Sequence, residues 1–285
     1  MPPTFPATAA APQASAPCVR DRAAIAGRLL RIVAIAWVAV AGVGQLFFAA
    51  YVSGFYGRTA LHGRWQDWNK VYSHNYVAGD GPGNAVMIVH LAFAVFLIVG
   101  GLLQLSPAVR ARWPPLHRWN GRIYVGAGAL MSLSGLSLMA LRGTPGDASQ
   151  DLGIGINAAL ILIFGWQAVR HARARRFDLH RRWALRLYLA MAGVWFFRIG
   201  LSLWLMINQG PAGFDPQTFS GPFLTVLSFA QYLLPLAMLE LYLRALARPN
   251  AAQRGAVAAA LMVATLATAG GVVAASMILW LPRLH

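Results

Sequence analysis

The stretches LHRWNGRIY (116–124) and LHRRWALRLY (179–188) carry nearly the same phrase. Each contains Leu-His-Arg, then a tryptophan, a second arginine and a tyrosine, and each leads into an apolar run. A glutamine also lies thirteen residues before the histidine of each copy. Internal duplication is common in membrane folds, and sites often lie where the repeats meet. The phrase therefore predicts two related helical hairpins, formed by the second and third spans and by the fourth and fifth.

The composition is typical of a membrane protein. The chain has 285 residues, of which 58% are hydrophobic and 11% are charged, whereas soluble domains carry about 25% charged residues. The formal charge of +16 would suggest nucleic-acid binding in a soluble protein. Here the basic residues cluster between apolar runs, so membrane lipids are the expected partners and nucleic acid is not. The single cysteine, Cys18, cannot form an internal disulfide.

Apolar runs long enough to span a bilayer recur along the chain. A spanning helix needs about 20 mostly apolar residues, and about seven such runs occur, with no alternating pattern of the kind that strands show. The runs cover residues 29–52, 85–105, 123–141, 154–169, 183–207, 223–243 and 256–281. We therefore expect an all-α, polytopic membrane protein. Residues 25–284 would form a single helical transmembrane domain with an outer loop at 53–84, after a disordered tail at 1–24 that is poor in large apolar residues.

The charge of the connecting segments predicts the topology. Basic segments alternate with segments that are acidic or mixed, and short basic connections usually face the cytoplasm. This pattern predicts a protein of the bacterial inner membrane with a cytoplasmic N-terminus and a C-terminus on the outside. Both copies of the repeated phrase would then lie at the cytoplasmic surface.

The repeated phrase also places arginines in pairs at helix starts. Arg118 and Arg122 are four residues apart, as are Arg182 and Arg186, so the members of each pair share a helix face. Helix N-termini favour anions, and tryptophans gather at headgroup depth. Two interpretations stay open. The phrases are lipid-facing anchors that set the topology, or they form a site between the hairpins for an anionic group, such as a lipid phosphate or the carboxylates of a cofactor.

Polar residues within the spans predict a second feature, a polar pocket in the outer half of the membrane. Ionisable groups in lipid are costly and by default mark function or a bundle interior. Arg198 cannot lose its proton and needs a partner, whereas Glu240 is expected to pair with Arg244 at i+4. The residues expected to converge in this pocket are His90, Arg198, Gln45, Asn157, Ser134, Ser137 and Gln231.

The two phrases, together with HLAFAVFLIVGGLLQL (90–105), resemble a bacterial family of predicted membrane proteins known as domain of unknown function 2306. The resemblance extends over about residues 30–245, and it implies a multi-pass membrane fold without an established activity. The positions that carry it are His90, Gly100, Gly101, Gln104, His117, Arg118, Gly121, Arg122 and Tyr124, followed by His180, Arg181, Arg182, Trp183, Arg186 and Tyr188.

Three functions compete. A redox protein would bind haem b, with His90, His117 and His180 as the candidate axial ligands, or a quinone. A lipid-binding, anion-binding or transport protein would use the duplicated basic phrases, although no interrupted helix is evident at matching positions of the two repeats. A structural subunit would perform no chemistry. The candidate ligand-binding residues are His90, Gln104, His117, Arg118, Arg122, Tyr124, His180, Arg181, Arg182, Arg186, Tyr188 and Arg198.

Whether the protein is an enzyme stays open at this point. The sequence contains no phosphate-binding loop, cysteine pair, nucleophile elbow or HExxH motif. No metal site other than a haem is predicted.

Overall fold

The computed structural model describes residues 17–72, 74–143, 146–248 and 250–284, with side chains from Asp21 onward. This part of the chain is helical and has no strands beyond one isolated bridge between Asp215 and Ser220. The elements are α1 (Pro17–Val52), the π-helical turn η1 (Ser53–Gly57), α2 (Arg58–Leu61), the 3₁₀ helix η2 (Trp65–Lys70), α3 (Gly81–Leu105), α4 (Pro107–Arg112), α5 (Pro114–Arg142), α6 (Ala148–Arg173), α7 (Phe177–Met191), α8 (Gly193–Asn208), α9 (Pro222–Ala247), α10 (Ala251–Ala275), η3 (Ser276–Trp280) and η4 (Leu281–Arg283).

The multi-pass helical architecture is confirmed. Within the described residues, six helices are long and apolar enough to cross a membrane, and the bent pair α7–α8 makes a seventh span if it is counted as one. The first span is longer than the predicted 29–52, because α1 continues through the π-helical turn η1 to Leu61. Residues 17–24, which the sequence assigned to a disordered tail, form the first turns of α1. Residues 1–16 lie outside the described part of the chain.

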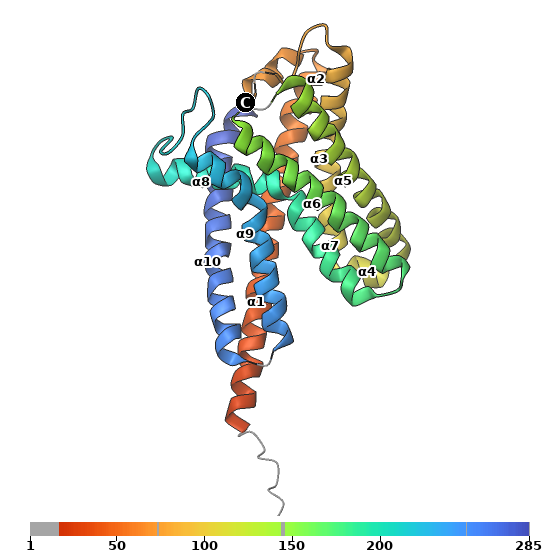
Figure 1. Cartoon of the computed structure of the whole chain (residues 1–285), viewed down its shortest axis with the longest axis vertical. Helices are drawn as coiled ribbons and strands as arrows, with labels where there is room; N and C mark the ends of the chain where they lie inside the picture. Colours follow the sequence, from red (N-terminus) through yellow and green to blue (C-terminus); the bar gives the residue numbers. More distant parts are fainter. Residues whose placement is uncertain (1–16, 73, 144–145, 249, 285) are drawn as a thin grey trace, which may run out of the picture.

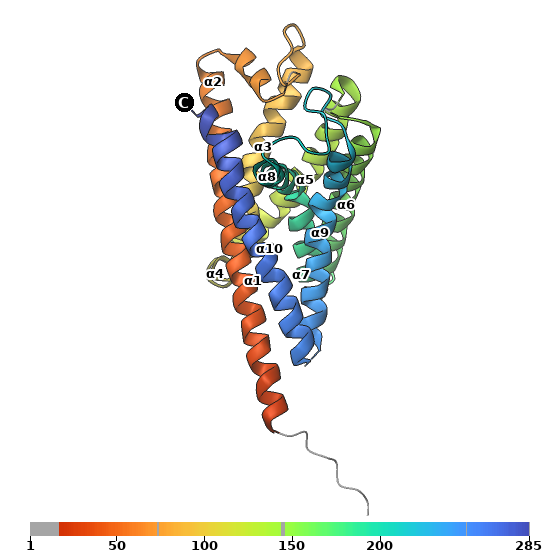
Figure 2. The same ribbon diagram turned by 90° about the vertical axis from the view of Figure 1, so that its left-hand side faces the viewer.

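The fifth span differs from the expectation of one straight helix over 183–207. α7 ends at Met191, α8 begins at Gly193, and the two axes are bent by 49°. Figure 2 shows α8 nearly end-on, whereas α1 and α10 run lengthwise in the same view. The break is confined to the second hairpin, because α5 continues without interruption past the equivalent level.

The helices form two groups, α3–α7 and α1 with α8–α10, which meet where α1 contacts α3 and α9 contacts α6 and α7 (Figure 1). α3 packs against α5 and α6 packs against α7, so both predicted hairpins are formed. On the other side α1 lies along α10, while α8 contacts α10 and α9. The connections α3–α4–α5, α6–α7 and α9–α10 all lie at one end of the bundle, which we call the basic end. The C-terminal turn and α2 lie at the opposite end.

The repeated tyrosines meet in the core. Tyr124 and Tyr188 are both buried, and both contact α3 at Gly101. A Cβ atom at Gly101 would lie 3.1 Å from Tyr124 Oη and 3.1 Å from Tyr188 Cε2. The hydroxyl of Tyr188 donates to Oε1 of Gln45 on α1, at 2.9 Å. The absence of a side chain at Gly101 therefore allows the two hairpins to close on each other and on α1.

The connection between α1 and α3, predicted as an outer loop at 53–84, is folded onto the bundle. Trp68 is buried, and its indole N–H donates to Oγ1 of Thr59 at 2.9 Å. Asp80 caps the start of α3 and forms an ion pair with Arg142 of α5, with Nη2 and Oδ2 2.6 Å apart. Arg142 also donates to two backbone carbonyls of this connection.

Close helix packing generates a stability prediction at Gly271 of α10. A Cβ atom there would lie 2.8 Å from the backbone carbonyl oxygen of Ile199 in α8, which cannot rotate away. We expect Gly271→Ala to lower the free energy of unfolding by about 1–3 kcal/mol, measured by thermal or denaturant unfolding in detergent. Gly255→Ala is the matched control, because the same helix has open space at that position. Equal stability of the two variants would contradict the packing.

The ion pair at the opposite end generates a pH prediction. The Arg142 side chain, assisted by the backbone N–H of Gly83, holds the pKa of Asp80 below its ordinary value of 3.8. A carboxyl group with a lowered pKa in the folded state stabilises the fold above its unfolded pKa, and the contribution is lost as the pH falls through the lowered value. Asp80→Asn should therefore reduce stability at neutral pH and weaken its decline below about pH 4.

The pH series requires unfolding midpoints between about pH 2.5 and pH 7. Asp178→Asn, which removes an exposed carboxylate at the start of α7, serves as the control. A decline in acid that is as steep in Asp80→Asn as in the unaltered protein would show that another group is responsible.

Candidate functional site

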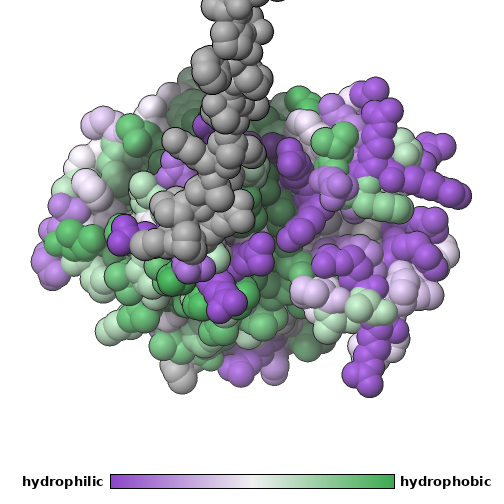
Figure 3. Space-filling view, turned by 90° about the horizontal axis from the view of Figure 1, so that it is seen from below, coloured by the Kyte–Doolittle hydropathy of each residue, from purple (hydrophilic) through white to green (hydrophobic). Residues whose placement is uncertain are grey.

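The basic end carries a dense group of exposed arginines. Segments 106–122 and 170–186 contain one acidic residue between them, Asp178. Seen from below in Figure 3, hydrophilic residues gather on the right-hand side of this face, under α4–α7. The exposed arginines are Arg110, Arg112, Arg118, Arg122, Arg170, Arg173, Arg175, Arg176, Arg181 and Arg182. The predicted site residues Arg118, Arg181 and Arg182 thus lie on an open surface.

The two copies of the repeated phrase form the same local contact. The guanidinium carbon of Arg122 lies 5.1 Å from the ring centre of Trp119, and that of Arg186 lies 4.7 Å from the ring centre of Trp183. We call these pairs the first and the second Trp–Arg corner. An arginine stacked on an aromatic face keeps the N–H groups around its edge for a carboxylate or phosphate. Each corner is therefore suited to an anionic group. The expectation that these arginines lie at helix starts is wrong, because α5 begins at Pro114 and α7 at Phe177, eight and nine residues before Arg122 and Arg186.

The two corners differ in how their arginines are engaged. Arg186 forms an ion pair with Glu240 of α9, with Nη2 2.6 Å and Nε 2.8 Å from the same carboxylate oxygen. This pair corrects the expectation that Glu240 binds Arg244, which is exposed and forms no ion pair among the described residues. Arg122 likewise contacts no carboxylate in the described part of the chain. The second corner is tied to α9, whereas the first stays open to a ligand.

A side-chain hydrogen bond closes each hairpin, but the glutamine that precedes each histidine by thirteen residues takes part only in the first copy. Gln104 donates from Nε2 to the carbonyl oxygen of His117 at 2.9 Å. In the second copy, Nδ1 of His180 donates to the carbonyl oxygen of Ala168 at 2.9 Å. Nδ1 of His117 is buried without a hydrogen-bond partner among the described residues. Gln104, His117 and His180 therefore join helix ends at the basic end.

The predicted outer-half pocket is divided in two by α8. On one side, Nδ1 of His90 lies 3.1 Å from Oγ of Ser134. Arg198 lies over the ring of Phe48 at 5.3 Å and donates to the carbonyl of Val194 at 3.2 Å. The other predicted members separate from this group.

Gln45 accepts from Tyr188, and Ser137 donates to the carbonyl of Leu133 in its own helix. Asn157 and Gln231 converge instead on Gly193, the first residue of α8. Gly193 and Arg198 are five residues apart, so the two positions differ by about 140° around the axis of α8. The expectation of one shared polar pocket is therefore wrong, because these side chains have different partners.

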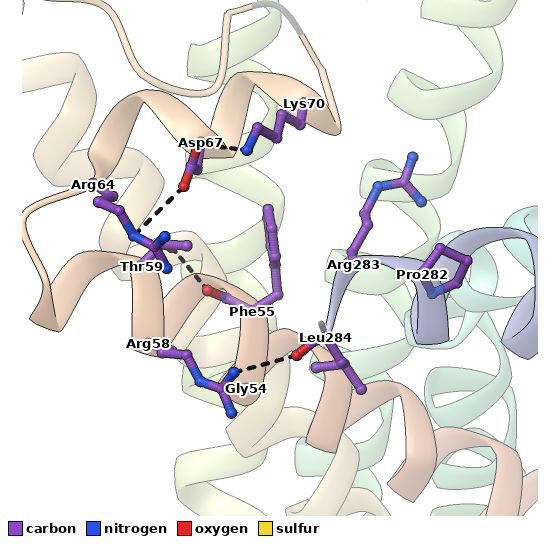
Figure 4. A pocket seen from close by; sticks show the side chains of 10 residues that line it. All are labelled: Gly54, Phe55, Arg58, Thr59, Arg64, Asp67, Lys70, Pro282, Arg283 and Leu284. Carbon is purple, nitrogen blue, oxygen red and sulfur yellow. Dashed lines mark hydrogen bonds and ion pairs between the residues drawn. The ribbon is translucent and has the colours of Figure 1, made fainter.

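Two cavities, of about 180 and 260 Å³, lie at the opposite end of the bundle. The first, shown in Figure 4, lies beside α2, η2 and the C-terminal turn, and its charged lining residues are Arg58, Arg64, Asp67, Lys70 and Arg283. Asp67 binds Lys70 at 2.7 Å and lies 3.7 Å from Arg64, so part of this charge is neutralised within the wall. The second cavity is lined by Asp80 and Arg142 among apolar residues. Neither contains a residue predicted as a ligand from the sequence.

Comparisons with known proteins agree with the membrane architecture. A family model described as Predicted membrane protein (DUF2306) matches residues 87–233, a little more than half of the chain. The match includes both Trp–Arg corners and the α7–α8 break, and it is narrower than the span of about 30–245 expected from the motifs. No curated protein and no solved structure matches the chain.

The Arg186–Glu240 ion pair allows a test of whether Glu240 interacts with Arg186 of α7 or with Arg244, four residues further along α9. The side chains are 18% and 36% exposed, so removing one partner leaves the other charge partly buried. We expect Arg186→Gln to lower the free energy of unfolding by about 1–2 kcal/mol, measured by thermal unfolding in detergent. Arg244→Gln, which removes the i+4 arginine, should have almost no effect. The opposite ranking of the two variants would refute the assignment.

Proposed function

The chain belongs to the family of predicted membrane proteins with domain of unknown function 2306, and we propose that it binds an anionic phosphate group at the first Trp–Arg corner. The family carries no named activity, so the proposal rests on the geometry of the site. Such a phosphate could be supplied by a lipid headgroup or by a soluble anion. The protein itself is a membrane protein with several apolar helices. The observation that carries the proposal is the open corner formed by Arg122 and Trp119 beside its closed counterpart.

Electrostatics supports an anion at this place. Segments 106–122 and 170–186 bring eleven arginines and one aspartate to the same end of the bundle. A basic surface beside a membrane attracts anionic lipids, at about 1 kcal/mol for each arginine near the surface. The excess of arginine over acidic residues would by itself attract anionic lipids without binding them at a defined position, as in any cytoplasmic loop that sets topology.

The first corner adds geometry to this diffuse attraction. Arg122 is held by the ring of Trp119, so its guanidinium is already oriented before a ligand arrives. Ordering a free arginine on binding costs about 0.5–1.5 kcal/mol, and prior orientation reduces that cost. The exposed side chain of Arg118 lies one helical turn earlier on the same face. Arg118 and Arg122 thus flank one position on the surface of α5.

Depth favours a phosphate of the lipid headgroup. Trp119 is 62% exposed and Trp113 is 56% exposed, and exposed tryptophans of membrane proteins concentrate at the level of the headgroups. The charge pattern predicts that this end faces the cytoplasm, where the leaflet is rich in anionic lipid. Localisation in a bacterial inner membrane, with the N-terminus inside and the C-terminus outside, forms part of the same proposal.

The redox alternative has weaker support. His90 lies about 22 Å along α3 from the basic end, so it cannot share a haem with His117 or His180. Haem ligation by two axial histidines would therefore need His117 and His180 together. Nδ1 of His180 donates to the carbonyl oxygen of Ala168, which leaves Nε2 of that ring free for a metal. Both histidines, however, lie near the starts of α5 and α7, at the basic end rather than deep within a span. A haem absorption band that is lost in His117→Ala would favour this function over lipid binding. The purely structural alternative predicts no specific ligand at all.

Lipid retention tests the proposal. We expect the protein, purified from membranes and exchanged into a zwitterionic detergent, to retain anionic phospholipid that native mass spectrometry detects. Arg122→Gln should lower the affinity for this lipid about fivefold, because one headgroup contact of about 1 kcal/mol is lost. Arg248→Gln is the matched control, since Arg248 is exposed at the same end but outside both corners. Equal losses in the two variants would reduce the effect to general charge and refute the proposed site.

A competition arm distinguishes the two sources of phosphate. Inorganic phosphate at millimolar concentration should not displace the retained lipid if the site binds a headgroup whose acyl chains lie in the membrane. Displacement by inorganic phosphate, with loss of that effect in Arg122→Gln, would instead assign the site to a soluble anion. Absence of any retained lipid and of any phosphate effect would contradict both.

A further inference from the structure

The cavity beside the C-terminal turn, shown in Figure 4, is a second place where positive charge gathers. Its volume is about 180 Å³, and its wall is formed by residues between 54 and 70, which follow the first span, and by residues 282–284. Arginine and lysine side chains are ionised at neutral pH. Four charged side chains of the wall are basic and one is acidic, namely Arg58, Arg64, Lys70, Arg283 and Asp67. The cavity therefore carries an excess of positive charge.

The single carboxylate in this wall is already engaged. Asp67 lies 2.7 Å from Nζ of Lys70 and 3.7 Å from Nε of Arg64, so it neutralises charge on the side formed by η2. Arg58 of α2 and Arg283 of η4 form no ion pair with any described residue. These two arginines are the cations that the cavity leaves without a counter-charge.

Both unpaired arginines are anchored and still have N–H groups to spare. Nη1 of Arg58 donates to the carbonyl of Leu284 at 3.2 Å, which joins α2 to the C-terminal turn, and Nη1 of Arg283 donates to the carbonyl of Leu279. A guanidinium carries several further N–H donors. Arg58 is exposed and Arg283 is partly exposed, so a ligand can reach them from solution. Anchoring reduces the cost of ordering these side chains when a ligand binds.

The rest of the wall is mostly apolar. Phe55, Pro282 and Leu284 line the cavity, and Figure 4 shows the ring of Phe55 standing among the other lining side chains. This ring is held in place by Tyr51, on which it stacks with 5.9 Å between the ring centres. The hydroxyl of Thr59 donates to the carbonyl of Phe55 at 2.8 Å and accepts from an indole N–H, so it is already used. The cavity thus combines arginine donors with an apolar surface.

We infer that this cavity binds a small organic acid, whose carboxylate is held by Arg58 and Arg283. Guanidinium groups match both oxygens of a carboxylate. The apolar part of the acid would lie against Phe55 and Leu284, which an inorganic anion could not use. The cavity is smaller than the roughly 300–1,000 Å³ of sites for drug-sized ligands, so the acid is limited to a few carbon atoms. The site lies at the end of the bundle opposite the Trp–Arg corners and is independent of the function proposed for them.

Anion-dependent stability tests the inference. Unfolding midpoints of the purified protein are measured at neutral pH in sodium chloride, butyrate and phosphate at constant ionic strength, with a glycine–serine tag after His285 so that no terminal carboxylate competes. We expect a saturable rise in butyrate relative to chloride, because a ligand bound only to the folded state stabilises it. Arg58→Gln and Arg283→Gln should each raise the half-saturating butyrate concentration about tenfold, because each removes a charge-assisted contact. Arg248→Gln, which removes an exposed arginine at the basic end, should leave it unchanged.

A further variant keeps the test informative if the arginine variants do not fold. Leu284→Glu places a tethered carboxylate in the cavity beside Arg58, so it should raise the midpoint in chloride and remove the response to butyrate. Arg122→Gln should keep that response, which separates this cavity from the phosphate site. Equal midpoints in chloride and butyrate, a butyrate response retained in Leu284→Glu, or a larger response to phosphate than to butyrate would each overturn the inference.

Discussion

Polar groups within a lipid bilayer must be satisfied inside the protein, because the hydrocarbon offers no hydrogen-bond partners. This constraint accounts for the distribution of charge in the structure. Exposed arginines concentrate at the basic end, whereas Arg58, Arg64 and the Asp80–Arg142 pair lie at the opposite end. Between the ends, some polar side chains are paired, as with Tyr188 and Gln45. Other buried polar atoms have no hydrogen-bond partner among the described residues, including Oγ of Ser202, Oη of Tyr232 and the amide oxygens of Asn157 and Gln231.

The same constraint explains why the duplicated phrase has two different outcomes. In both copies a tryptophan holds an arginine three residues later, and a tyrosine two residues after that enters the core at Gly101. The second copy lies next to α9, where Glu240 neutralises Arg186. The first copy faces no acidic residue in the described part of the chain, and its arginine is exposed. Different packing of the two copies thus leaves Arg186 in an ion pair and Arg122 without one.

Much of the architecture follows from the sequence because it depends on local properties. Run length gives the spans, alternation of charge places the repeated phrases at one end, and spacing of three residues would also have indicated the stacking of Arg122 on Trp119. Contacts between helices are harder to infer. Glu240 has Arg244 one turn away, yet it binds Arg186 of another helix, because packing rather than spacing decides which arginine is close.

The break at Ala192 also lacks a local signal, since no proline lies near it, and the sequence around it is as apolar as a continuous span. Depth along the helices predicts comparable levels for Asn157 and Arg198 and a level nearer the midplane for Gln231, but it carries no information on which side of α8 each residue lies. The sequence therefore predicts one outer-half pocket, whereas the structure shows two groups of polar residues with different partners.

Both Trp–Arg corners lie at the basic end of the bundle, and we expect this end to lie at one face of the membrane. Single cysteines at Ala108, Asp178 and Gln217, in a chain with Cys18 replaced by serine, test it with a membrane-impermeant thiol reagent applied to intact cells and to inverted vesicles. The account predicts that positions 108 and 178 react from the same side and position 217 from the other, whereas reaction of 108 and 178 from opposite sides would contradict it.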